Sequence, residues 1–324
     1  MLLVAACAPA VSGEAQSGTS LQICSRRTER VTFADPLLQE AVQNTLGQDV
    51  ITCGNLRRLR RLTVSLEDGT VTDLRGLQNA VNLTRLILNR HEVTDLSPLS
   101  RLTRLNQLRL NNNRVADLTP LSGLTNLSEL RLNNNGVSDI TPLAGLARLS
   151  QLFLDGNQVA DLTPLSGLRG LSQLRLNDNR VTDLTPLSGL TNLSQLQLNN
   201  NGVSDLTPLS NLTRLSQLQL TNNEVTDVWP IFELTRLTQL RLGGNSVQDL
   251  LVISSLGSLT RLDLESNQIR DVRPLLASPS LGEGVTIRLE RNCLDLGGGA
   301  NLDAILELIA RGVAVTYEPQ DACS

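Results

Sequence analysis

The chain has 324 residues, enough for two globular domains or one repeat array, and its formal net charge is −4. Hydrophobic residues make up 40% of it, yet it has only three Phe and a single Met, Trp and Tyr, so the core must come from a repeated module of small aliphatic residues. All 28 basic residues are arginine, and the slight acidic balance excludes general nucleic-acid binding, which needs a net basic face.

The N-terminal seven residues end in Val-Ala-Ala-Cys, which resembles a bacterial lipobox, where the cysteine is acylated after cleavage. No basic residue precedes Cys7 and the apolar run is short for a signal peptide. We therefore interpret residues 1–7 as a signal-peptide remnant whose coding sequence starts further upstream. Residues 8–32, which begin Ala-, Ser- and Gly-rich, are expected to form a flexible tether. The alternative is the plain hydrophobic N-terminus of a cytosolic protein.

Residues 33–60 have the pattern of a helical N-terminal cap. Asp35 and Pro36 are a typical N-cap and first helical residue, apolar residues follow at helical spacing, and Gly47 ends the pattern. The predicted amphipathic helix would cover the open edge of whatever structure follows it.

Residues 61–295 form a repeat array. Nine regular units of 22 residues run without insertion over 83–280, each close to LxxLxLxxNxVxDLTPLxxLxx, with divergent units at both ends. The LxL segment predicts one short strand per unit, and stacked units would align these strands in a parallel sheet. The expected fold is an α/β leucine-rich-repeat solenoid, with a curved sheet on the concave side and short 3-10 turns on the convex side.

Asparagine occupies the ninth position of eight consecutive units, where its amide can satisfy backbone groups of the turn. The only histidine, His91, takes this position in the first regular unit, so we interpret it as a structural substitute and not as a catalytic base. The asparagines are Asn113, Asn135, Asn157, Asn179, Asn201, Asn223, Asn245 and Asn267.

Aspartate recurs at the thirteenth position, from Asp73 to Asp271, usually before Leu-Thr-Pro-Leu. This predicts an aspartate that caps each short helical turn. Calcium binding along the row is a weaker alternative, because a calcium shell needs about six to eight oxygens that converge on one point.

The third and fifth positions of the unit flank the central strand leucine, so their side chains should point to the concave face in columns. Arginine and an aromatic residue dominate binding hot spots, and both gather in the fifth column. Stacked Arg and Gln that merely solvate the sheet are the alternative. The predicted partner-binding residues are Arg109, Arg131, Phe153, Arg175 and Arg241 from the fifth column and Gln151, Gln173 and Gln195 from the third.

One unit departs from the pattern on its turn side. Trp229 lies in Val-Trp-Pro-Ile-Phe, which replaces the usual Leu-Thr-Pro-Leu. It marks either a contact on the convex side or a local rearrangement of packing, and the second is the more frequent outcome.

Residues 296–324 are expected to form a C-terminal α/β cap, with an amphipathic helix up to Gly312 and a short strand after it. The cysteines lie only toward the chain ends. We predict that Cys24 pairs with Cys53 and Cys293 with Cys323, each closing a loop worth roughly 3 to 4 kcal/mol. Such disulfides imply an oxidising compartment.

The unit Asn-x-Val-x-Asp-Leu-Thr-Pro-Leu resembles the internalin type of bacterial leucine-rich repeat over roughly residues 33–320, and the segment from Phe33 to Gly47 is similar to that family's helical cap. Internalins are surface proteins that bind host receptors through the concave sheet. These 324 residues contain no immunoglobulin-like domain or sortase motif, and few concave aromatics. The resemblance therefore implies extracellular recognition more than host invasion.

The residues for an enzyme are missing from the sequence. A single histidine excludes most catalytic triads and His-based zinc sites, and we expect no cofactor and no metal. The leading hypothesis is a monomeric, non-enzymatic scaffold, extracytoplasmic and anchored to the membrane only through a lipid on Cys7, which binds protein or glycan. An envelope-associated structural protein without a specific ligand and a cytosolic regulatory scaffold are the alternatives.

Overall fold

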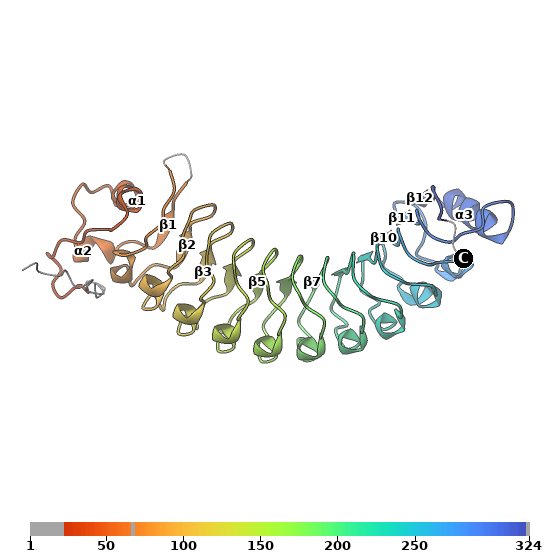
Figure 1. Cartoon of the computed structure of the whole chain (residues 1–324), viewed down its shortest axis with the longest axis horizontal. Coiled ribbons are helices and arrows are strands. Elements are labelled where there is room, and N and C mark those ends of the chain that lie inside the picture. Colours follow the sequence, from red (N-terminus) through yellow and green to blue (C-terminus); the bar gives the residue numbers. More distant parts are fainter. Residues whose placement is uncertain (1–22, 66–68, 322–324) are drawn as a thin grey trace, which may run out of the picture.

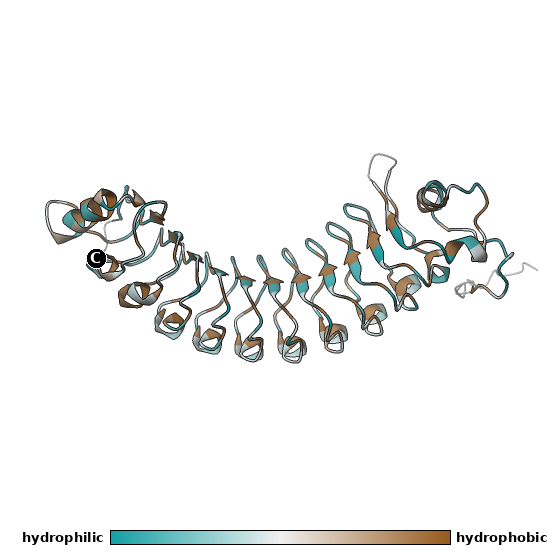
Figure 2. Ribbon diagram, turned by 180° about the vertical axis from the view of Figure 1, so that it is seen from behind, coloured by the Kyte–Doolittle hydropathy of each residue, from teal (hydrophilic) through white to brown (hydrophobic). Residues whose placement is uncertain are grey.

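The computed structural model describes residues 23–65 and 69–321, which form an arch (Figure 1). Within these residues, twelve parallel strands form one sheet in chain order along the inner, concave edge, and 3-10 helices line the outer, convex edge. This is the predicted leucine-rich-repeat solenoid. Figure 2 shows hydrophobic and hydrophilic residues recurring at equivalent places in successive units.

Each strand has three residues, and in the regular units these are the leucine at the fourth position and the residue on either side of it. The strands are β1 (Arg61–Thr63), β2 (Arg85–Ile87), β3 (Gln107–Arg109), β4 (Glu129–Arg131), β5 (Gln151–Phe153), β6 (Gln173–Arg175), β7 (Gln195–Gln197), β8 (Gln217–Gln219), β9 (Gln239–Arg241), β10 (Arg261–Asp263), β11 (Thr286–Arg288) and β12 (Ala314–Thr316). The 3-10 helices are η2 (Leu77–Asn79), η3 (Ser97–Leu99), η4 (Thr119–Leu121), η5 (Thr141–Leu143), η6 (Thr163–Leu165), η7 (Thr185–Leu187), η8 (Thr207–Leu209), η9 (Trp229–Ile231), η10 (Leu251–Ser255) and η11 (Arg273–Ala277).

The core is a column of aliphatic side chains between the sheet and the convex turns. In one unit the consensus leucines and valine are all buried, so a single unit depends on both neighbours for its core. These residues are Leu105, Leu108, Leu110, Val115, Leu118, Leu121 and Leu124.

The asparagine ladder joins each unit to the one before it, as predicted. Asn113 Nδ2 donates to Leu88 O at 2.7 Å in the preceding unit and to Leu110 O at 3.0 Å in its own. Asn113 Oδ1 accepts from Val93 N at 3.0 Å, again in the preceding unit. His91 takes the same place: it is buried, and its Nδ1 accepts from Val71 N at 3.2 Å. Its structural role is confirmed.

The aspartate column differs in detail from the prediction. Asp117 lies one residue before the N-cap residue of η4, which is Leu118, and its Oδ1 accepts from Thr119 N at 2.8 Å. The carboxylate thus closes an Asx turn over two residues and does not occupy the cap position itself. The same bond recurs along the column in Asp95, Asp139, Asp161, Asp183, Asp205, Asp227, Asp249 and Asp271.

Helix α1 (Pro36–Leu46) begins at the predicted N-cap, Asp35, and ends at Gly47. Asp35 Oδ1 accepts from the backbone N–H groups of Leu37 and Leu38, and its Oδ2 accepts from Thr72 N at 2.8 Å. One carboxylate therefore starts the helix and ties it to the first divergent unit.

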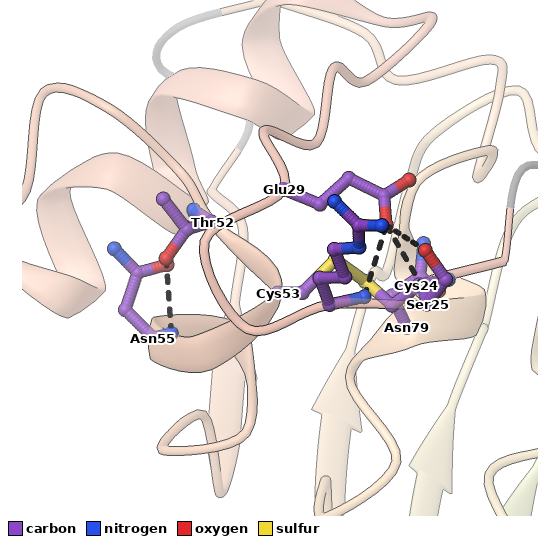
Figure 3. The surroundings of a disulfide bond; sticks show 8 residues. Cys24, Ser25, Glu29, Thr52, Cys53, Asn55 and Asn79 are labelled. Atoms are coloured by element: carbon purple, nitrogen blue, oxygen red, sulfur yellow. Dashed lines mark hydrogen bonds between the residues drawn. A yellow bond between two sulfur atoms is a disulfide. The ribbon is translucent and has the colours of Figure 1, made fainter.

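The Cys24–Cys53 disulfide is formed as predicted, with 5.8 Å between the Cα atoms (Figure 3). Cys53 opens the short helix α2 (Cys53–Leu56), which a Thr52 and Asn55 capping box begins. Cys24 N also donates to Asn79 Oδ1 at 2.8 Å. The segment before α1 is thereby fixed to the first convex turn.

At the other end, helix α3 (Ala300–Ala310) packs against η11, and β12 extends the sheet beside β11. The predicted helix and strand are both present. Cys293 is disulfide-bonded, whereas its predicted partner, Cys323, lies outside the described residues, as does Cys7.

Candidate functional site

The concave face carries a charged cluster on strands β3 and β4. Glu129, at the start of β4, is only 5% exposed. It accepts hydrogen bonds from Arg109 Nε at 2.7 Å and from Arg131 Nε. Arg109 Nη2 also donates to Glu129 Oε2 at 3.3 Å, so one buried carboxylate holds both arginines in place.

Phe153, in the next strand, lies between two guanidinium groups. The Arg131 Cζ atom is 4.5 Å and the Arg175 Cζ atom 5.4 Å from its ring centroid, which is the geometry of cation–π contacts. Arg175 Nε in turn donates to Asp155 Oδ2 at 2.8 Å. We call Arg109, Glu129, Arg131, Phe153, Asp155 and Arg175 the Phe153 cluster.

The electrostatics of the cluster favour the charged form of the Glu129 carboxylate. Burial alone would raise the pKa of Glu129, but hydrogen bonds and positive charge from Arg109 and Arg131 outweigh burial and lower it from its ordinary value of 4.5. Three arginines against two acids leave one excess positive charge. Phe153 itself is only 7% exposed, so the surface of the cluster is formed by its charged groups and not by the ring.

The structure brings most of the predicted partner-binding residues together on the concave face and leaves one of them apart. Arg109, Arg131, Phe153 and Arg175 come together in the Phe153 cluster. Gln151, Gln173 and Gln195 lie side by side in register beside it, half-buried. Arg241 is separate, on β9, where it pairs in register with Gln219 and Asp263, and its buried Nε makes no hydrogen bond within the described chain.

Sequence reasoning missed the two acids that organise the cluster. Glu129 is the only acid in the third column, and Asp155 takes a seventh position that is asparagine in units on both sides. Asp155 Oδ1 also accepts from Asn177 N at 3.0 Å, so it keeps the structural bond that asparagine makes elsewhere. The sequence did contain a signal for these two residues: each is an acidic residue that interrupts a column of uncharged polar residues next to arginines.

A second ionic cluster, not predicted, lies toward the C-terminal end of the concave face. Arg288 on β11 makes ion pairs with buried Asp263 at 3.3 Å, with Glu265, and with Glu290 at 3.5 Å. Acids outnumber the base here, the reverse of the Phe153 cluster. Across residues 23–65 and 69–321, no group of three His, Cys, Asp or Glu side chains is arranged to hold a metal ion.

The comparisons with known proteins agree with this fold. The family model for leucine-rich repeats in two copies matches residues 81–123, 125–167 and 169–211. The crystal structure of the internalin InlF from Listeria monocytogenes is 31% identical, with a TM-score of 0.77, and the match covers 90% of this chain and 92% of that one. The chain belongs to the internalin family of leucine-rich-repeat proteins. Such proteins are generally non-enzymatic, protein-binding scaffolds.

Two further structures place this internalin-like chain among its relatives. Internalin C2 from Listeria monocytogenes is 34% identical with a TM-score of 0.61, over 67% of this chain and 94% of that one. The ectodomain of the Arabidopsis thaliana receptor kinase GASSHO1/SCHENGEN3 shares the fold at 24% identity and a TM-score of 0.59, over 67% of this chain and 28% of that one. No curated protein matches the sequence. In the described part of the chain, no helix is long and apolar enough to cross a bilayer.

Proposed function

We propose that this chain is an extracytoplasmic recognition scaffold that binds a protein ligand through the Phe153 cluster, most directly through an acidic side chain of that ligand. The observation that carries the proposal is Phe153 held between Arg131 and Arg175, with each arginine fixed by a nearly buried acid. Preorganised arginines lose little conformational freedom when they bind, and an aromatic residue between them is typical of hot spots. The excess positive charge of the three guanidinium groups favours a carboxylate partner.

The disulfide between Cys24 and Cys53 supports an oxidising location outside the cytoplasm. We further propose that a lipid on Cys7 anchors the chain at the membrane surface. We also propose that the scaffold is a monomer. Mass spectrometry of the N-terminal peptide tests the anchor: a diacylglycerol thioether on the cysteine is the expected result, and an unmodified mature N-terminus contradicts the anchor.

Site-specific photo-cross-linking tests the concave site. A benzoylphenylalanine placed at Gln151, beside the cluster, should cross-link the full chain to a discrete protein in its native envelope preparation. The same probe at Thr185, on the convex turn η7, is the control and should not. Arg131→Gln together with Arg175→Gln should remove the concave product.

A glycan ligand predicts no protein adduct at either position but retention of the chain on a glycan array, lost in the same double variant. If neither assay gives a product that depends on the two arginines, the protein serves a structural role and the proposal is wrong.

A further inference from the structure

The convex face has one region that departs from the repeat in three places at once. At the fifteenth position of the unit, five consecutive copies have threonine, whereas the next two have Trp229 and Leu251. At the eighteenth position, where the six preceding copies have Ser or Ala, the first of these units has Phe232, and its successor returns to serine. The consensus residues preceding them are Thr119, Thr141, Thr163, Thr185 and Thr207.

These substitutions do not fill the core. Trp229 is 60% exposed, and Phe232 and Leu251 are also exposed. The rings of Trp229 and Phe232 stack on each other, with centroids 5.6 Å apart and an interplanar angle of 19°. Trp229 therefore packs locally on Phe232, but at the surface, and its ring adds nothing to the interior. We call Trp229, Phe232 and Leu251 the convex patch.

The repeat itself provides the reference for interpreting the patch. Every other regular unit folds the same 3-10 turn with smaller or polar residues at both positions or, in the last one, with Arg273 and Leu276. Stability therefore does not require three large apolar side chains in water, and a group of such residues is typical of a contact surface.

Charge around the convex patch identifies the kind of partner. The unit of Trp229 is the most acidic of the nine, with Glu224, Asp227 and Glu233 against one arginine. A small cleft of about 40 Å³ is lined by Trp229 together with the carboxyl-bearing Asp227 and Asp249. Asp249 also lines the adjoining cleft of about 370 Å³, whose wall includes Leu251 and one basic residue, Arg270, against the two acids Asp249 and Asp271. Neither Asp227 nor Asp249 has an ion-pair partner in residues 23–65 and 69–321.

From this arrangement we infer that the convex patch is a second binding surface, independent of the Phe153 cluster, for an extended basic segment of a protein partner. A guanidinium or ammonium group lies over the exposed face of Trp229 and pairs with Asp227 and Asp249, as cation–π and charge complementarity require. A neighbouring apolar side chain of the partner covers Leu251 in the larger cleft. A neutral or acidic partner would leave the carboxylates unpaired beneath it.

The test uses the full chain and its own fluorescence. Because Trp229 is the only tryptophan, its emission reports on this surface without a label. Titration with the peptide acetyl-Gly-Arg-Leu-Arg-Leu-Arg-Gly-amide should give a saturable change that weakens at high salt, and the version with glutamate in place of arginine should give none.

Matched variants separate this surface from the rest of the column. Asp227→Asn with Asp249→Asn should weaken the arginine peptide about 5- to 30-fold, the value for two partly exposed ion pairs. Asp139→Asn with Asp161→Asn removes the same charge from the same turns of unmodified units and should leave the Kd unchanged. Asparagine keeps the oxygen that closes each turn, so both pairs should fold.

Restoring the consensus by Trp229→Thr, Phe232→Ser and Leu251→Thr should abolish peptide binding in calorimetry and leave the melting temperature within a few degrees. Arg131→Gln, on the concave face, should not affect it, so failure here leaves the concave proposal standing. Four results overturn the inference. Three are no fluorescence change, an equal response to the glutamate peptide, and a salt-independent response to cellohexaose, which would assign the patch to a glycan. The fourth is self-association of the chain that the consensus variant abolishes, which would assign the patch to a second copy.

Discussion

Glu129→Gln tests the central claim about the Phe153 cluster, that one nearly buried carboxylate holds two arginines. Removing one partner of a buried ion pair costs about 3 to 5 kcal/mol. The side chains of Arg109 and Arg131 are 27% and 30% exposed, however, so water compensates part of the loss. We therefore expect about 2 kcal/mol of lost folding free energy at neutral pH, measured by urea unfolding followed by circular dichroism.

The lowered pKa of Glu129 also predicts how the loss of folding free energy in Glu129→Gln changes with pH. Because the folded pKa of Glu129 lies below its ordinary value, the carboxylate stabilises the fold above the unfolded pKa, and this contribution is lost as the pH falls through the folded pKa. The free-energy difference between the parent chain and Glu129→Gln should therefore be constant above about pH 5.5 and shrink on acidification below the unfolded pKa, which is the ordinary value of 4.5.

A matched control comes from an exposed ion pair. Glu92 pairs with Arg114 at 2.9 Å, but both side chains are largely solvated, so Glu92→Gln should change stability by less than about 0.5 kcal/mol. An equal loss in the two variants, or a loss for Glu129→Gln that persists unchanged at pH 3, would refute the reasoning.

Three further predictions concern the scaffold. Asn157→Ala should cost about 3 kcal/mol in urea unfolding, because the buried amide makes three hydrogen bonds of 2.9 to 3.0 Å to backbone groups; a loss below 1 kcal/mol would contradict a structural ladder. His91→Asn should instead raise the melting temperature, since the imidazole makes two longer bonds, of 3.2 and 3.3 Å, where the amide donates to several carbonyls in other units. Cys24→Ala with Cys53→Ala should lower the free energy of unfolding by roughly 3 to 4 kcal/mol, measured without reductant so that the disulfide of Cys293 stays intact.

The fold was predictable because its determinants repeat. The leucine spacing, Asn113 and its equivalents, and the Asp35–Pro36 start of α1 each depend on local geometry or on contacts with the adjacent unit. Each of these contacts recurs every 22 residues, so the sequence pattern that predicts it occurs many times along the chain. The Asx turn at Asp117 was not predicted. An aspartate at the N-cap and an aspartate one residue before it recur at the same 22-residue spacing, so the sequence pattern does not distinguish the two hydrogen-bonding roles.

The site was only partly predictable because its contacts occur once. Which side chain Arg131 approaches depends on rotamers in three neighbouring strands, and no period specifies that Glu129 accepts from both sides. The composition of the fifth column was enough to find Phe153 and its arginines, but not Asp155. Likewise, Trp229 was visible as an exception to the repeat, whereas its exposure depends on how η9 presents position fifteen.

The asparagine ladder also bears on how the protein can evolve. Since every regular unit meets the next through the same amide and the same strand register, recombination between units can insert or delete 22 residues without requiring a new interface. The Phe153 cluster spans four consecutive units and the convex patch two. An exchange that takes place between the two surfaces leaves both intact and changes the distance between them in steps of one unit. The number of units between the two surfaces therefore sets the distance between them, and it can change without altering what each surface recognises.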